Sequence, residues 1–440
     1  MKEVLRKYQK GAFMTKKGNF KDIITFGFAL FAMFFGAGNL IFPPYLGIIS
    51  GPSWFVAFAG FTIADAGLAL LAIIAIALCE GDIMKLFEKI GKGPAILLSF
   101  ADIMCVGPLL VIPRTGATTY EMGITPILGQ NTPILLVVAV FFALTFVLTV
   151  RPSKVIDIVG QVLTPFLIIA LLVIIVKGVI SPLGQPVAEP MIANIFQRGI
   201  TDGYQTMDCF VPLAVGAVLI LTLREKGYTE PKDQVSLLIK AGIVACIGLG
   251  VIYGGLTYLG STVSTMYGVD AQKSQVIVNI TQMLLGNSGK TVLAVAVSLA
   301  CLTTSIGLTS ASAEYLSSLT KNKVSYPVFV AIICVFSAGA ATIGVAGLVM
   351  IANPILAIVY PPTIVLIVLT IARSKVKNPN VYRFAAYLTL IISILTLVST
   401  KVPALDFINK LPLANLGFNW VIPAIIAGLM GSLVGRKKLA

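Results

Sequence analysis

The sequence predicts an all-α polytopic membrane protein with about twelve transmembrane helices. Of the 440 residues, 57% are hydrophobic and 11% are charged, and the mean hydropathy is +0.97. No class of soluble domain has this composition. Apolar runs of the length that crosses a bilayer, about 20 residues, recur along the whole chain with short polar connections between them. The chain therefore has no room for a sizeable domain outside the lipid bilayer.

Twelve apolar runs are the expected spans. They cover residues 22–50, 53–79, 94–122, 133–150, 152–177, 201–223, 233–260, 290–318, 325–343, 346–372, 382–400 and 418–435. An even number of spans places both termini on one side of the membrane. Loops on that side hold 24 of the 32 Lys and Arg residues, which predicts that both termini are cytoplasmic.

Several function classes are excluded by residue content. The net charge of +14 reflects loop charges that orient spans, and because no base-reading or phosphate-binding motif is present, we expect no nucleic-acid partner. The chain has no His, which excludes His-based catalysis, haem and zinc sites. Its six Cys residues are scattered through apolar runs, without a Cys-x-x-Cys pair, and are expected to be buried apolar side chains. We expect no enzyme activity.

The first span carries the main functional signal. Gly36-Ala37-Gly38-Asn39 lies about fifteen residues into the span, near the middle of a bilayer, and Pro43 and Pro44 follow within two turns. Glycine, asparagine and proline disfavour a continuous helix, so we expect a break here. A break frees carbonyls that can bind a cation and N–H groups that can bind a carboxylate. The alternative is a glycine patch for close helix packing.

The sixth span has a second weak point, and the two weak points suggest inverted halves. Asp208-Cys209-Phe210-Val211-Pro212 lies at the centre of this span. The first to fifth spans form one set of five and the sixth to tenth form another. Because five is an odd number, the second set is inverted relative to the first, as in many transporters with a midplane site. The expected parts are a cytoplasmic N-terminal segment (1–21), a first repeat (22–177), a connector with a surface helix (178–200), a second repeat (201–372), and two further spans with a basic C-terminus (373–440).

Polar side chains inside spans are the remaining candidates. Thr303 and Thr304 in the eighth span offer hydroxyl oxygens that suit Na⁺, although such hydroxyls often bond within their own helix. Arg114 in the third span is either an outer-gate residue or a structural partner of Glu121. Asp208 could neutralise a substrate amine or a cation, or cap the broken helix. Asp65 and Asp102 are further ionisable residues within spans.

Three motifs resemble those of the bacterial branched-chain amino acid uptake carriers. They are FGFALFAMFFGAGNLIFPPYLG at 26–47, GPLLVIPRTGATTYE at 107–121 and GYQTMD at 203–208. The resemblance extends over essentially the whole chain. It implies a LeuT-like fold with a 5+5 inverted repeat and two C-terminal helices, located in the bacterial cytoplasmic membrane. It also implies Na⁺-driven import of leucine, isoleucine and valine.

The resemblance also implies roles for individual residues. Main-chain contacts of Gly36, Ala37, Gly38, Asn39 and Leu40 would hold the substrate carboxylate, and Cys209, Phe210, Pro212 and Leu213 would line the other wall. Asp208, which comes from the position of the weak point and not from the resemblance, is added to the substrate-binding candidates. A Na⁺ site maps onto Ala32, Phe35, Ala300, Thr303 and Thr304. Some LeuT-like carriers have a second Na⁺ site that uses an Asn of the seventh span, which this chain lacks although Asn39 matches.

We therefore expect a Na⁺ symporter of branched-chain amino acids, with Na⁺ as coupling ion and no other cofactor. A carrier of the same fold that uses H⁺, through Asp208 or Asp65, or that takes another small apolar amino acid is the nearest alternative. An ion channel would need a symmetric filter of short re-entrant segments, which the sequence does not contain.

Overall fold

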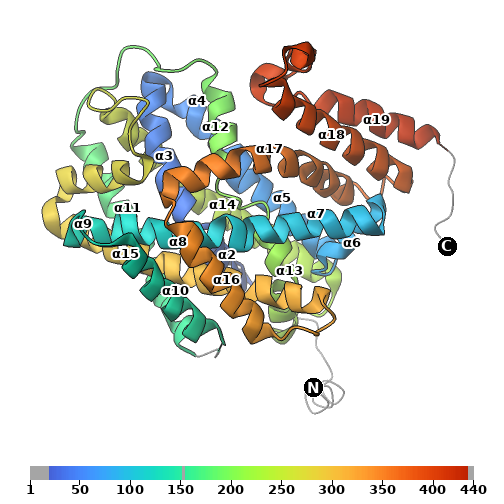
Figure 1. Ribbon diagram of the computed structural model, residues 1–440, viewed down its shortest axis with the longest axis horizontal. Helices are drawn as coiled ribbons and strands as arrows, with labels where there is room; N and C mark the ends of the chain where they lie inside the picture. The colour runs from blue at the N-terminus through green and yellow to red at the C-terminus, as the bar shows by residue number, and fades with distance from the viewer. Residues whose placement is uncertain (1–18, 151–153, 435–440) are drawn as a thin grey trace.

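A computed structural model describes residues 19–150 and 154–434, and every regular element in these two ranges is helical (Figure 1). The expected segment before residue 19 and the basic C-terminus after residue 434 lie outside the described residues. Six helical stretches of the described chain are long and apolar enough to cross a membrane, and shorter apolar helices accompany them. The prediction of an all-α membrane fold is confirmed.

Each of the twelve expected runs coincides with helix. The longer helices are α2 (Phe20–Phe34), α3 (Ala37–Ser50), α4 (Trp54–Thr62), α5 (Leu68–Leu78), α7 (Lys92–Met104), α8 (Val111–Thr118), α10 (Ile134–Val150), α11 (Lys154–Ile180), α12 (Ile195–Tyr204), α13 (Val211–Glu225), α14 (Pro231–Thr262), α15 (Lys273–Leu319), α16 (Tyr326–Ala341), α17 (Gly344–Ile371), α18 (Pro379–Ser399) and α19 (Val421–Leu433). Short α6 (Ile83–Phe87) and α9 (Thr125–Leu128) connect them. Three π-helical turns, η2 (Ile63–Gly67), η4 (Cys105–Leu109) and η5 (Thr119–Ile124), interrupt the second and third runs.

The expected connector at 178–200 is corrected by the position of α12. This helix begins at Ile195 and is the first half of the sixth span, not a surface helix. Gly199 is buried, and a Cβ on it would lie 2.3 Å from the Ala57 carbonyl oxygen of α4. Because glycine lets the two backbones approach so closely, α12 packs into the bundle and the connector ends about one turn earlier.

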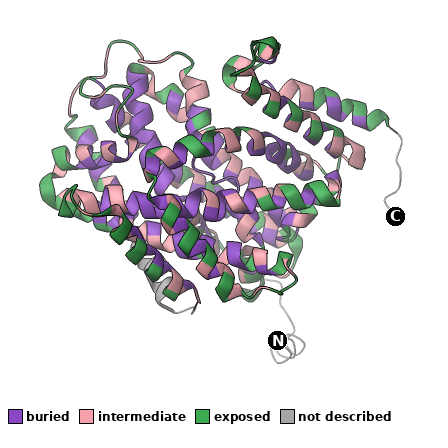
Figure 2. Ribbon diagram, in the orientation of Figure 1, coloured by how far each residue is buried: buried purple, intermediate pink, exposed green. Residues whose placement is uncertain are grey.

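The helices form a central bundle with a peripheral pair. Long α14 packs along α2, α3 and α5, while α15 packs against α3, α8 and α11. The pair α18 and α19 lies at the edge of the bundle, beside α17 (Figure 1). Figure 2 shows buried residues concentrated in the middle of the bundle and exposed ones on its periphery. Many of the exposed side chains are large and apolar, which is the surface expected against lipid.

The closest helix crossing joins α3 to α14. A Cβ on Gly47 would lie 1.9 Å from the Thr257 carbonyl oxygen, and a Cβ on Gly260 would lie 1.9 Å from the Pro44 carbonyl oxygen. The two main chains are therefore in direct contact. This contact fixes the second half of the first span against the seventh span.

We expect Gly260→Ala to destabilise the protein, because its methyl group would meet main-chain atoms that cannot turn aside; such overpacking costs about 1–3 kcal/mol. Gly250→Ala in the same helix is the matched control, because a Cβ there meets nothing within 4 Å. The control should be neutral or should stabilise by up to about 1 kcal/mol. Thermal unfolding in detergent measures both, and equal melting temperatures would contradict the main-chain contact.

Candidate functional site

The first span is broken where the sequence predicts. Helix α2 ends at Phe34, Phe35 and Gly36 are extended, and α3 begins at Ala37. The Gly36 N–H donates to Asn39 Oδ1 at 2.8 Å, in place of the Ala32 carbonyl that a continuous helix would offer. The break lies before the Pro43-Pro44 pair, which is inside α3. The double proline therefore does not mark the break itself.

The sixth span is broken as well. Helix α12 ends at Tyr204, α13 begins at Val211, and the six residues between them are joined only by turns. Met207 has a left-handed conformation with φ of 64°. Pro212 lies in the first turn of α13, where a missing N–H has no cost, and so it starts the second half-helix instead of loosening the first. The prediction of two interrupted helices is confirmed.

Asn39 joins the two breaks. Its amide nitrogen lies 2.8 Å from Asp208 Oδ2 of the second break, 2.5 Å from the Tyr253 hydroxyl of α14 and 3.5 Å from Asp65 Oδ1. All four side chains are buried. The Asp65 and Asp208 carboxyl groups therefore share one donor, the Asn39 amide nitrogen. The structure thus brings Asn39 and Asp208 together, as predicted, and adds Asp65 and Tyr253.

From the sequence, Asp65 was named only as a possible proton-coupling residue, and Tyr253 was not named at all. Asp65 lies in the π-helical turn η2, and such turns are frequent at functional sites. A single aspartate in an apolar run was visible in the sequence. The direction of its side chain, however, depends on the π-helical turn, which the spacing of apolar residues does not reveal. Tyr253 gave no signal, because a tyrosine in a long apolar helix is common.

Arg114 also belongs to this centre. Its guanidinium Nη1 donates to the Gln205 carbonyl at 2.5 Å and its Nη2 to the Thr206 carbonyl at 3.4 Å, and both carbonyls lie in the second break. A Cβ on Gly38 would lie 3.3 Å from Arg114 Nη2. Arg114 is only 2% exposed, and its Nε has no hydrogen-bond partner in the part of the chain that the structure describes.

The expected pairing of Arg114 with Glu121 is wrong. Glu121 Oε1 accepts from the Val345 N–H at 2.8 Å, and its Oε2 accepts from the Ser274 hydroxyl. Arg114 and Glu121 are seven residues apart, which corresponds to about 10.5 Å along a helix axis, and each side chain therefore bonds to nearer partners. Arg114 takes the carbonyls freed by the second break. Glu121 instead ties the third span to the starts of α15 and α17.

The remaining predicted residues are placed as follows. The substrate candidates Gly36, Ala37, Gly38, Leu40, Cys209, Phe210, Pro212 and Leu213 line the two breaks, and all but Gly36 are buried. Of the cation candidates, Ala32 and Phe35 lie at the end of α2, while Ala300, Thr303 and Thr304 lie on α15. The Thr303 hydroxyl donates to the Ala300 carbonyl at 2.9 Å, within its own helix.

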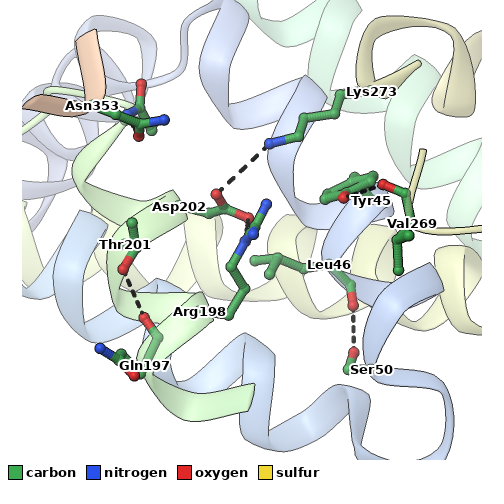
Figure 3. Close-up of polar contacts among 11 residues, drawn as sticks. Tyr45, Leu46, Ser50, Gln197, Arg198, Thr201, Asp202, Val269, Lys273 and Asn353 are labelled. Carbon is green, nitrogen blue, oxygen red and sulfur yellow. Dashed lines mark hydrogen bonds and ion pairs between the residues drawn. The ribbon is translucent and has the colours of Figure 1, made fainter. Parts of the chain in front are cut away.

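A second polar cluster lies at the face where α12 begins (Figure 3). Asp202 of α12 contacts Arg198 Nε at 2.9 Å and Lys273 Nζ of α15 at 3.9 Å. The Lys273 ammonium also lies 4.6 Å from the ring centroid of Tyr45 on α3, whose hydroxyl donates to the Val269 carbonyl at 2.7 Å. These contacts join both half-helices, α3 and α12, to the start of α15.

Comparisons with known proteins place the whole chain among sequences of one family. The family model for branched-chain amino acid transport protein matches residues 19–438. The chain is 37% identical to the branched-chain amino acid permease BraB of Bacillus subtilis, over 93% of this chain and 95% of that one. It is 33% identical to the permease BrnQ of Escherichia coli K12, over 96% and 98%.

Solved structures share the fold at low sequence identity. The inward-facing conformation of Mhp1 matches with a TM-score of 0.57 at 14% identity, covering 93% of this chain and 91% of that one. An outward-open Na⁺-coupled sialic acid symporter matches with a TM-score of 0.58 at 13% identity, covering 95% and 91%. Both are LeuT-fold transporters, so the predicted LeuT-like fold is confirmed. The apolar helices and the permease relatives indicate a multi-pass integral membrane protein.

We expect Asn39→Ala to lower stability strongly, because it removes partners from the Gly36 N–H and from Asp208, and each buried group left unpaired costs about 1–3 kcal/mol. Asn409→Ala is the control, since Asn409 is exposed and its described hydrogen bonds, to Ser399 and Asp406, lie at the exposed surface. Thermal unfolding in detergent is the measurement. A control that loses as much as Asn39→Ala would contradict the linking role of Asn39.

Proposed function

The chain belongs to the family of branched-chain amino acid transport proteins, and we propose that it imports leucine, isoleucine and valine together with Na⁺ by alternating access. The observation that carries this proposal is the pair of broken helices that meet at Asn39. Breaks in facing half-helices supply loose N–H and carbonyl groups at the middle of the bundle, which is the chemistry that a zwitterion and a cation require.

In this proposal the start of α3 binds the substrate carboxylate. The first turn of α3, Ala37–Asn39, presents N–H groups that have no acceptor within the helix, at the positive end of the helix dipole, while Asn39 takes the Gly36 N–H. Arg114 lies beside Gly38 and would add a full positive charge, with its Nε still available as a donor. Asp208 would face the substrate amine. This arrangement places opposite charges at the two ends of an amino acid.

The second break would line the apolar part of the substrate. This wall is formed by four buried residues, Cys209, Phe210, Pro212 and Leu213. The ring centroids of Phe210 and Tyr360 are 4.3 Å apart. An apolar pocket separates leucine, isoleucine and valine only weakly, by about 1–3 kcal/mol for each methylene. Transport of all three by one carrier is consistent with such a wall.

Na⁺ would bind where α2 ends, between the carbonyls of Ala32 and Phe35 and the oxygens of Ala300, Thr303 and Thr304. The Gly36 N–H donates to the Asn39 side chain and not to the Ala32 carbonyl, its acceptor in a continuous helix. The Ala32 carbonyl oxygen is therefore free of this hydrogen bond, which supports the proposed Na⁺ site. A hydroxyl that donates within its helix, like that of Thr303, keeps lone pairs for a cation. The excess of Lys and Arg in alternate loops supports cytoplasmic termini.

The combined variant Thr303→Ala plus Thr304→Ala should lose Na⁺ stimulation of leucine uptake, because two ligands of the ion are removed. Uptake into proteoliposomes with Na⁺ replaced by K⁺ at fixed pH is the measurement. Thr291→Ala is the control, since this hydroxyl also bonds within α15 but is exposed. Full Na⁺ dependence in the double variant would remove the proposed ion site, and absence of substrate-dependent Na⁺ flux in the wild type would end the Na⁺ proposal.

The cluster around Asp202 would act as the outer gate. Asp202→Asn removes the negative charge that pairs with Arg198 and Lys273. Loss of about 1 kcal/mol of ion pairing should raise the population of the outward-open state about fivefold. Buried Cys209, kept as the single cysteine, should then react faster with an impermeant maleimide. Asp406→Asn, in the exposed pair with Lys410, is the control and should leave the rate unchanged. Equal rates in all three proteins would refute the gate.

A further inference from the structure

Three charged side chains meet at the two breaks, and their charges do not cancel. Asp65 comes from η2, Asp208 from the second break and Arg114 from α8. Their exposed fractions are 0%, 4% and 2%. With both carboxylates ionised, the group carries one net negative charge away from water. A buried charge of this kind is strongly unfavourable unless a cation compensates it.

Among the described residues, Arg114 makes no hydrogen bond or ion pair with either carboxylate. Its two terminal nitrogens donate to main-chain carbonyls of the second break, and its Nε has no partner in this part of the chain. The free Nε and the neighbouring Gly38 direct Arg114 toward the carboxylate subsite at the start of α3. The guanidinium charge is therefore matched by the substrate carboxylate, and the aspartate pair needs its own partners.

The hydrogen-bond donors around the aspartates are also too few. Asn39 has two N–H groups and Tyr253 one O–H group, shared between the two carboxyl groups and each other. The Thr206 hydroxyl, which lies beside Asp65, donates to the Gly203 carbonyl at 2.7 Å. Asp65 Oδ2 is fully buried and has no hydrogen-bond partner among residues 19–150 and 154–434. A set of oxygens with spare lone pairs and few protons suits a hard cation.

We propose that Asp65 and Asp208 bind one coupling cation of single positive charge, Na⁺ or a proton, in a site completed by Asn39, Tyr253 and Thr206. The inference rests on the proposed transport function and adds a cation site to it, separate from the one at the end of α2. When the site is full, the two aspartates and Arg114 carry one net negative charge, the zwitterionic substrate carries none, and one cation makes the sum zero. This balance sets one cation at this site for each amino acid.

Other titratable groups face the pair and do not supply the missing charge. They are Tyr253 and Cys246 of α14, Tyr360 of α17, Cys209 of the second break, and Arg114 of α8. Of these only Arg114 is a cation, and its charge is already counted. The compensating charge must therefore enter from solution, which couples the occupancy of the site to the cation gradient.

The test uses Asp65→Asn and Asp208→Asn in proteoliposomes, because either change makes the group neutral without a cation. We expect Asp65→Asn to keep leucine exchange but to lose the cation-driven accumulation that depends on this site. Asp208→Asn also removes the charge that would face the substrate amine, so it should lose the same cation effect and bind leucine more weakly. In Asp65→Asn the cation at this site should no longer raise leucine affinity, a loss of the roughly 5- to 150-fold that such coupling provides. Asp102→Asn is the matched control, since Asp102 is also buried but contacts Thr363 of α17 instead of this cluster.

Two arms identify the cation. At fixed pH, loss of Na⁺ stimulation in the Asn variants identifies Na⁺; without Na⁺, loss of the wild-type pH dependence identifies a proton. Wild-type cation dependence in both variants, or an equal loss in Asp102→Asn, overturns the proposal. If the Asn variants do not fold, Asp65→Glu and Asp208→Glu keep the charge and should change the apparent cation affinity; unchanged affinity in both overturns it.

A separate readout distinguishes this inference from the proposed function. In detergent and without substrate, Na⁺ at fixed pH, or pH without Na⁺, should shift the melting temperature of the wild type more than that of Asp65→Asn, which keeps only the proposed Na⁺ site at the end of α2. If the wild type transports no leucine yet shows this difference, the transport proposal fails and the cation site stands. If the wild type accumulates leucine but both Asn variants keep its cation dependence, the site fails and the transport proposal stands.

Discussion

Every feature of the centre follows from one constraint, that a main-chain group freed inside an apolar bundle must find a partner there. The first break gives the Gly36 N–H to the Asn39 side chain. The second gives the carbonyls of Gln205 and Thr206 to Arg114. Two helices can be interrupted because each break recruits a polar side chain from another segment or from its own first turn. Those recruited side chains are then the ones available to bind solutes.

The most informative positions in the sequence were the polar residues, glycines and prolines that interrupt apolar runs. Gly36 and Asn39 in an apolar run indicated the first break, and Pro212 indicated the second to within a few residues. Such residues act through local backbone preferences, which sequence contains. The twelve runs were equally visible, because lipid demands long apolar stretches.

Partner choice could not be predicted in the same way. Arg114 was expected to meet Glu121 or to gate the outer face, yet it binds carbonyls about ninety residues away along the chain. That contact exists only after the third and sixth spans pack together. The surface helix expected before residue 200 is similarly a buried half-helix, because Gly199 permits a close approach to α4 that no hydropathy pattern encodes. Local chemistry predicted which residues matter, and packing decided what they touch.

The main-chain contact between α3 and α14 determines which pieces of the protein can move separately. Since Gly47 and Gly260 leave no side chain between the two helices, α3 cannot pivot without taking α14 along. Asn39 and Tyr253 lie on this shared body, and Asp65 lies in η2, which packs against it as well. Asp208 instead follows α12 in the second break, so a movement of α12 away from α3 would separate Asp208 from the Asn39 amide, and releasing the ion and exposing the solute would become a single mechanical event.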